Sequence, residues 1–194
     1  MVSCEHARHI GKVMILKRLL RLVRHEWLVR RRPNEFAREV GVRLGDDCRL
    51  LGLTRKTFGS EPYLVQLGNH VTLTGNVRFV THDGGVWVFR DREPDIELVD
   101  PIIVGNNVFI GLGSIILPGV RIGDNVVIGA GSVVNRDIPS DSVAAGCPAR
   151  VLSSLDEYWT KVERRAVHCP RDFDDDAKRA FLEEYVSDRF PDVR

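Results

Sequence analysis

Aliphatic residues recur at every sixth position through the centre of the chain. Six consecutive hexads begin at residue 104 and read VGNNVF, IGLGSI, ILPGVR, IGDNVV, IGAGSV and VNRDIP. Their first positions are all Val or Ile: Val104, Ile110, Ile116, Ile122, Ile128 and Val134. Their fourth positions are residue types that tolerate a positive φ: Asn107, Gly113, Gly119, Asn125, Gly131 and Asp137. The pattern therefore predicts one turn per hexad.

Three such sides would close a triangular coil, and successive coils would stack at about 4.8 Å. Each aliphatic residue should then lie over the one three hexads earlier. The fifth positions are mostly small or β-branched, as expected of side chains that share a narrow interior: Val108, Ser114, Val120, Val126, Ser132 and Ile138. An ordinary β-sandwich is the alternative, but its strands would alternate with period two. The hexads favour an all-β fold, a parallel β-helix.

The repeat continues upstream in broken form. Leu67, Leu73 and Phe79 keep the same hexad step, as do Leu44 and Leu50. Leu98 is taken as the next column residue after Phe79, so we expect residues 81–97 to form a looped-out insertion. A second irregularity falls between residues 50 and 67.

Both ends of the chain have helical periodicity. From Ile10 to Arg32, apolar residues follow three- and four-residue steps, and Pro33 should end that helix. The acidic residues 174–176 precede a second periodic segment and would complement the dipole of a helix start. The expected organisation is a basic helical segment at 1–40, a β-helix domain at 41–152 and a helical extension at 153–194.

Charge is distributed unevenly. The net charge is +1, but residues 1–32 carry nine Lys or Arg against Glu5 and Glu26, which leaves +7 there and −6 elsewhere. No nucleic-acid motif accompanies this basic segment, so no nucleic-acid partner is expected. We expect the helix to pack on the β-helix or on a neighbouring subunit, and weak contact with a membrane surface is the other fate considered. No apolar run is long enough to span a bilayer, which favours a cytoplasmic protein. The four cysteines are scattered and are expected to be free thiols.

Several segments resemble the hexapeptide-repeat acyltransferases, a family that includes galactoside, maltose and xenobiotic acetyltransferases and the O-acetyltransferases of capsule and O-antigen synthesis. The resemblance is carried by FGSEPYLVQLGNHVTL, FVTHDGG, IGLGSIILPGVRIGDNVVIGAGSVV and AAGCPARVL. It implies a left-handed β-helix, a homotrimer, acetyl-coenzyme A as acyl donor and an active site between two β-helices. The implied base is His82, and the implied coenzyme A contacts are Leu112, Ala130, Asn135, Arg136 and Arg150. Cys147 departs from the usual family ending.

An imidazole suits the general base that acyl transfer requires. His70 is the rival to His82, but it occupies a turn position of its hexad, so we interpret it as structural. Asp83 could orient the imidazole or hold a turn, and Glu61 could line the acceptor side or begin a turn before Pro62. Trp87 and Phe89 could offer an apolar face to a sugar ring, although anchoring of the insertion to the β-helix is the simpler expectation.

The function expected from these features is acetyl-coenzyme A-dependent O-acetylation of a sugar or polysaccharide-precursor hydroxyl. Transfer to the amine of an amino sugar-nucleotide, or to a xenobiotic, are the enzymatic alternatives. A γ-type carbonic anhydrase would need three zinc-binding histidines, and the β-helix region has only His70 and His82, so no metal is expected. A non-enzymatic scaffold would not need the insertion that carries His82.

Overall fold

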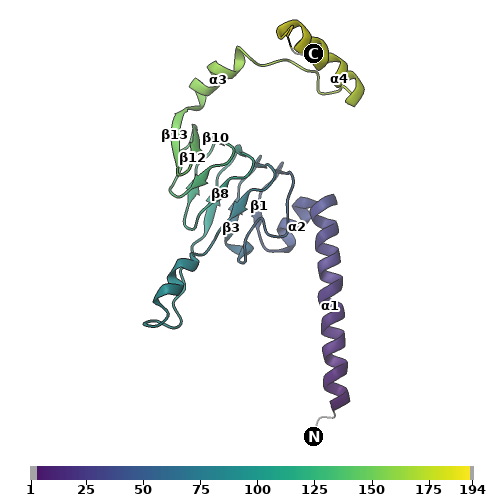
Figure 1. The fold of residues 1–194 in the computed structure, drawn as a ribbon, viewed down its shortest axis with the longest axis vertical. Helices are drawn as coiled ribbons and strands as arrows, with labels where there is room; N and C mark the ends of the chain where they lie inside the picture. Colours follow the sequence, from purple (N-terminus) through teal and green to yellow (C-terminus); the bar gives the residue numbers. More distant parts are fainter. Residues whose placement is uncertain (1–3, 193–194) are drawn as a thin grey trace. The chain divides into compact units, whose positions relative to one another are not determined.

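A three-sided parallel β-helix forms the centre of the protein, as seen in the computed structural model (Figure 1). The structure describes residues 4–192, with side chains from residue 18 onward. The chain folds as two compact units, Met1–Tyr158 and Trp159–Arg194. The first unit contains the β-helix, and the predicted triangular coil is confirmed.

Each side of the β-helix is one sheet of short parallel strands. The first side stacks β1 (Arg43–Leu44), β3 (Val65–Leu67), β6 (Ile102–Val104) and β9 (Arg121–Ile122). The second stacks β2 (Arg49–Leu50), β4 (Thr72–Leu73), β7 (Val108–Ile110), β10 (Val126–Ile128) and β12 (Ser142–Gly146), with β13 (Ala149–Ser154) antiparallel at its edge. The third stacks β5 (Arg78–Phe79), β8 (Ile115–Ile116) and β11 (Val133–Val134). We call the turns that follow these sides the first, second and third corners.

The predicted column of aliphatic residues fills the interior. Val104 pairs with Ile122, Ile110 with Ile128 and Ile116 with Val134, so each residue lies against the one three hexads further along, as predicted. All six predicted first-position residues are at most 2% exposed. Burial of an aliphatic side chain of this size contributes about 1.5–3 kcal/mol, so the column is a main source of the stability of the β-helix.

The last hexad departs from the prediction. Ile138 pairs with Ile122, whereas an unbroken repeat would set Ser140 there, so the third corner is shorter on this coil. Asp137 is not among the residues with positive φ, so the predicted turn conformation is absent at this corner. The Asp137 carboxylate accepts a hydrogen bond from the Arg121 N–H at 2.8 Å, so this side chain links two coils where a turn was expected.

The insertion is longer than predicted, and Leu98 belongs to it. Leu67 pairs with Val104, which lies about two coil lengths further along the chain instead of one. The insertion therefore adds about one coil length of chain. Leu98 is 39% exposed, and the interior resumes at Ile102.

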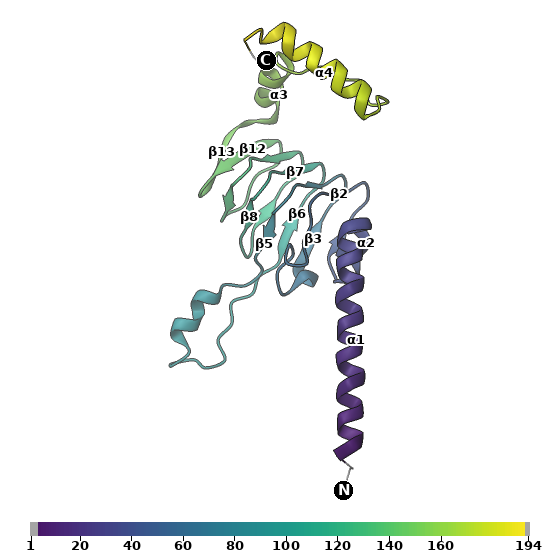
Figure 2. The ribbon, with the colours of Figure 1, turned by 45° about the vertical axis from the view of Figure 1, so that its right-hand side comes forward.

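The insertion projects from the β-helix (Figure 2). Trp87 and Phe89 lie in its 3₁₀ turn, Gly84–Phe89, and both are exposed. The expectation that these aromatic residues anchor the insertion to the β-helix is therefore wrong.

The second irregularity is confirmed at the expected place. Leu44 pairs with Leu67, whereas an unbroken repeat would set Pro62 there, so the first coil contains additional residues. They lie in a segment that ends in a 3₁₀ turn, Pro62–Leu64. This segment includes Glu61, which lies at the third corner.

The N-terminal segment is helical, as predicted, and Pro33 ends the first helix and begins the second. Helix α1 spans Cys4–Arg31 and α2 spans Pro33–Glu39. Among the side chains described from residue 18 onward, the buried ones of α1 lie near its end: His25, Leu28 and Val29. The preceding apolar side chains are at least 41% exposed: Leu19, Leu20, Leu22, Val23 and Trp27. No helix among residues 4–192 is long and apolar enough to cross a membrane.

The C-terminal helices are α3 (Leu155–Glu163) and α4 (Asp175–Arg189). Asp174 caps α4, because its carboxylate accepts a hydrogen bond from the Ala177 N–H at 2.8 Å. Asp175 and Asp176 lie in the first turn. The predicted acidic helix start is thus confirmed.

Candidate active site

The third corner brings Glu61 and His82 together. The rings of Phe58 and Phe79 stack with their centroids 5.5 Å apart on successive coils. Glu61 follows Phe58 by three residues, and His82 follows Phe79 by three residues. The two side chains therefore leave the β-helix at the same corner, one coil apart.

The two residues form a close carboxylate–imidazole pair. His82 Nδ1 lies 2.9 Å from Glu61 Oε2, and the Thr81 hydroxyl donates to the same oxygen at 2.7 Å. An ionised carboxylate can only accept hydrogen bonds, so Nδ1 carries a hydrogen, and in the neutral ring Nε2 has the free lone pair. The His82 side chain is 39% exposed. This arrangement leaves Nε2 able to accept a proton from a bound molecule.

The same contacts keep Glu61 ionised. Burial of the carboxyl group opposes ionisation, but hydrogen bonds from Thr81 and His82 outweigh that cost, and the pKa of Glu61 is lowered from its ordinary value of 4.5. Thr81 is fully buried at this contact, and the sequence interpretation missed its role. Its place in the hexad gave no signal, because only the stacking of coils sets it against Glu61.

The neck of the insertion fixes the backbone of His82. His82 pairs antiparallel with Val99, and the flanking hydrogen bonds join Asp83 N–H to Leu98 O and Asp100 N–H to Thr81 O, both at 2.9 Å. Asp83 does not contact the imidazole. Its carboxylate accepts from the Gly85 N–H at 2.8 Å and caps the 3₁₀ turn of the insertion, so of its two expected roles the turn role is the one observed.

His70 has the structural role expected of it. It turns the chain at the first corner with φ +54°, and its Nδ1 lies 2.8 Å from Asn107 Oδ1. A ladder of side-chain hydrogen bonds continues from Asn107 to Asn125 and from Asn125 to Asp141, each at 2.8 Å. His70 is thus the first member of a ladder that ties successive coils together.

Leu112 and Ala130 lie at the second corner, away from His82 within one chain. They stack on each other, since the Gly131 N–H donates to Leu112 O at 2.7 Å. The chain runs along β8 between Leu112 and the third corner, which separates them by roughly 16 Å when extended. Neither the Leu112 nor the Ala130 N–H donates to a backbone carbonyl among residues 4–192. A single chain therefore does not bring these donors to the imidazole.

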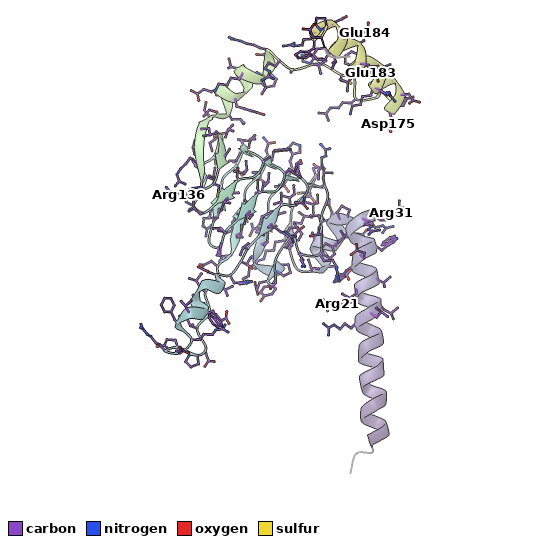
Figure 3. The ribbon with its side chains drawn as sticks, in the orientation of Figure 1. Arg21, Arg31, Arg136, Asp175, Glu183 and Glu184 are labelled. Carbon is purple, nitrogen blue, oxygen red and sulfur yellow. The ribbon has the colours of Figure 1, made fainter. Side chains whose placement is uncertain are left out.

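The remaining predicted coenzyme A contacts lie on the later coils. Asn135 and Arg136 follow β11 at the third corner, two coils beyond His82, and both are exposed. Figure 3 shows Arg136 at the edge of the β-helix. Arg150 is on β13, where its guanidinium donates to Ala149 O at 2.7 Å. Cys147, in the departure from the family ending, is an exposed free thiol that precedes a cis Pro148.

A cavity of about 310 Å³ is lined by residues that follow Glu61 and Asp100 in the chain. Arg43, Tyr63, Gln66 and Pro101 are among the residues that line it. Tyr63 follows Glu61 by two residues, and Pro101 follows Asp100, which is bonded to Thr81. Within residues 4–192, no group of His, Cys, Asp and Glu side chains is arranged to hold a metal ion. The site therefore offers an imidazole that is oriented by a carboxylate and partly exposed.

Comparisons with known proteins agree with this architecture. Residues 101–136 match the family model described as the hexapeptide repeat of succinyl-transferase. The chain is 43% identical to the galactoside O-acetyltransferase of Escherichia coli over 98 residues, which cover 50% of this chain and 47% of that enzyme. A solved structure of the hexapeptide-repeat acetyltransferase VCA0836 from Vibrio cholerae with acetyl-coenzyme A is 31% identical, with 59% of this chain and 61% of that chain covered and a TM-score of 0.49.

Protein CapG of Staphylococcus aureus matches over a greater length. It is 50% identical over 153 residues, which cover 79% of this chain and 89% of CapG. Identity at half of the positions over almost the whole of CapG extends the likeness beyond the hexads to the insertion and Glu61 segments. The chain therefore belongs to the hexapeptide-repeat acyltransferase family.

Proposed function

We propose that the protein is an acetyl-coenzyme A-dependent O-acetyltransferase that acts on a hydroxyl of a sugar or polysaccharide precursor. The observation that carries this proposal is the Glu61–His82 pair at the neck of the insertion. A carboxylate that holds Nδ1 leaves Nε2 as a base, and removal of a hydroxyl proton is what attack on a thioester requires. The 43% identity to a galactoside O-acetyltransferase supports the choice of acceptor class.

In the proposed mechanism, His82 Nε2 accepts the proton of the acceptor hydroxyl as its oxygen attacks the thioester carbonyl. The tetrahedral intermediate then expels the coenzyme A thiolate, and the imidazolium returns the proton to that sulfur. Glu61 stabilises the imidazolium and keeps the ring oriented, and Thr81 keeps Glu61 in place. General base catalysis of this kind contributes about 10²–10⁴-fold to the rate.

We propose that the active site is completed by a second chain within a homotrimer. Leu112 and Ala130 offer backbone N–H groups without backbone acceptors among the described residues, yet they lie at a different corner from His82. In a ring of chains, the second corner of one β-helix can face the third corner of its neighbour. One of these N–H groups would then stabilise the oxyanion, since an aligned donor is worth about 10²–10³-fold in rate.

Coenzyme A would extend along the same groove toward the later coils. Arg136 is exposed and has no ion pair among the described residues, so it is free to bind a phosphate. Asn135 lies beside it, and Arg150 on β13 would provide a second guanidinium. Trp87, exposed on the insertion, is proposed to contact the acceptor sugar or the neighbouring chain.

Transfer to the amine of an amino sugar-nucleotide would use the same base and is the second candidate. The test is release of coenzyme A from acetyl-coenzyme A by the full-length protein with paired hydroxy and amino sugars, with the acetylated product identified by mass spectrometry. We expect ester products that survive neutral pH and are lost on mild alkaline hydrolysis. If only amide products formed, N-acetylation would be supported and O-acetylation contradicted. Coenzyme A binding without any product would contradict both proposals.

A further inference from the structure

A second cavity, of about 320 Å³, also has Tyr63 in its lining and includes two arginines. It is formed where α1 and α2 approach residues 55–63 of the first coil. Its lining includes the cationic side chains of Arg21 and Arg55 and the aromatic side chains of Phe36, Phe58 and Tyr63. None of the functional roles assigned above uses this cavity.

The cavity has an excess of positive charge. Glu39 also lines it, but the Arg24 guanidinium occupies that carboxylate with three hydrogen bonds of 2.8–3.2 Å. Arg21 has no ion pair among the described residues. Arg55 has only a long contact of 3.7 Å with Glu26, which Arg30 approaches more closely at 3.3 Å. Two guanidinium groups are therefore available to an anion.

The cavity also borders the chain segment that carries Glu61. Ser60 and Pro62 both line it, and they are the two neighbours of Glu61 in the chain. Gly59, another lining residue, packs so closely on the next coil that an added Cβ would lie 2.9 Å from Phe79 O. Tyr63 lines both this cavity and the 310 Å³ cavity described above. The cavity is therefore lined by residues on both sides of Glu61 in the chain.

We propose that this cavity is a subsite for a phosphate group of the acceptor, bound by Arg21 and Arg55. The acceptor would then be a phosphorylated sugar, with its phosphate between the two guanidinium groups and its hydroxyl at His82. Guanidinium groups bind phosphate in bidentate geometry, and the aromatic walls would contact the sugar ring. This inference rests on the proposed acyl transfer and narrows its acceptor class.

The test uses inorganic pyrophosphate as probe and the full-length protein saturated with coenzyme A, so that the coenzyme A site is filled. Calorimetry should detect pyrophosphate binding, and Arg21→Gln and Arg55→Gln should each raise its Kd by about tenfold or more. Both side chains are exposed, so both variants should fold. Arg31→Gln is the matched control, because it removes the same charge from the same helix outside the cavity (Figure 3).

A kinetic arm tests the assignment to the acceptor. Arg21→Gln should raise the KM for galactose 1-phosphate about tenfold while the KM for acetyl-coenzyme A stays within twofold of wild type. The proposal would be overturned by any of three results: no binding of pyrophosphate, an effect of Arg31→Gln equal to that of Arg21→Gln, or a raised KM for acetyl-coenzyme A. If pyrophosphate binding depends on Arg21 but no acceptor is acetylated, the proposed function fails and the anion site stands.

Discussion

Two histidines, His70 and His82, occupy the same position of the hexad at different corners, and their ring nitrogens have different partners. His70 and His82 each follow the column residue of their side by three, after Leu67 and Phe79 respectively. His70 adopts φ +54° and turns the chain, whereas His82 remains extended and enters the neck of the insertion. The first bonds an amide in a ladder between coils, and the second bonds a carboxylate. The residue type is the same, so two other features distinguish the histidines. One is the partner of Nδ1, and the other is whether the coil continues after the residue or is interrupted by the insertion.

The largest expected effect separates the two histidines by rate. His82→Ala removes the proposed base, so kcat for acetyl transfer should fall by about 10²–10⁴-fold while acetyl-coenzyme A affinity is nearly unchanged. His70→Ala should retain kcat per folded molecule. Steady-state kinetics with calorimetric binding of coenzyme A would check both, and a reversed pattern would exchange the two assignments.

A smaller loss of rate is expected from the partner of the base. Glu61→Gln keeps the shape of the side chain but removes the charge that stabilises the imidazolium. A hydrogen bond to a charged group is worth about 1.5–3 kcal/mol, so kcat should fall by about 10- to 100-fold with KM little changed. Asn107→Ala removes the partner of His70 and serves as the control. If its kcat fell as much as that of Glu61→Gln, the rate would not depend specifically on the partner of His82.

At the first corner, a substitution should lower stability and leave the rate unchanged. His70→Ala breaks one hydrogen bond of the ladder, and the free energy of unfolding should fall by about 1 kcal/mol. The measurement is urea unfolding followed by circular dichroism. An unchanged midpoint would mean that the ladder contributes nothing and that His70 is free for another role.

The smallest effect is a pH dependence of stability at Glu61. Because its pKa is lowered in the folded state, ionised Glu61 stabilises the fold above pH 4.5, and this contribution is lost as the pH falls through the lowered pKa. The free energy of unfolding of the wild type should exceed that of Glu61→Gln by under about 1 kcal/mol at neutral pH. In acid the two free energies should be equal. Thermal unfolding of the two proteins across this pH range would detect the convergence, and a constant difference would contradict it.

Much of the fold could be predicted because the hexad columns report the interior directly. The aliphatic column residues from Val104 to Val134 are buried. A β-helix buries one residue in six in this way, whereas the strands of a sandwich alternate with period two. The last corner could not be predicted in the same way, since Asp137 is a residue type that suits a turn. It caps the Arg121 N–H instead, a contact that depends on the adjacent coil. Leu98 was misassigned for a similar reason, because a leucine after a polar loop resembles a column residue.

The site was only half visible in the sequence. His82 could be proposed as the base from its place at the start of the insertion, but its contact with Glu61 depends on the stacking of Phe58 on Phe79. That register includes the additional residues of the first coil, which the periodicity alone does not locate. The separation of Leu112 from His82 also required the structure, because it depends on which corner each residue occupies.

Mixed oligomers test directly whether the active site is shared between chains. His82→Ala lacks the base, and Ala130→Trp fills the second corner, so each variant alone should be inactive. Wild type should be a trimer by light scattering, with three times the mass of the 21.9 kDa chain. Co-expression of the two variants in equal amounts should restore roughly a quarter of wild-type activity, because a quarter of the interfaces would pair an intact His82 with an intact second corner. Activity that stays at the level of the separate variants, or a stable monomer, would contradict the shared site.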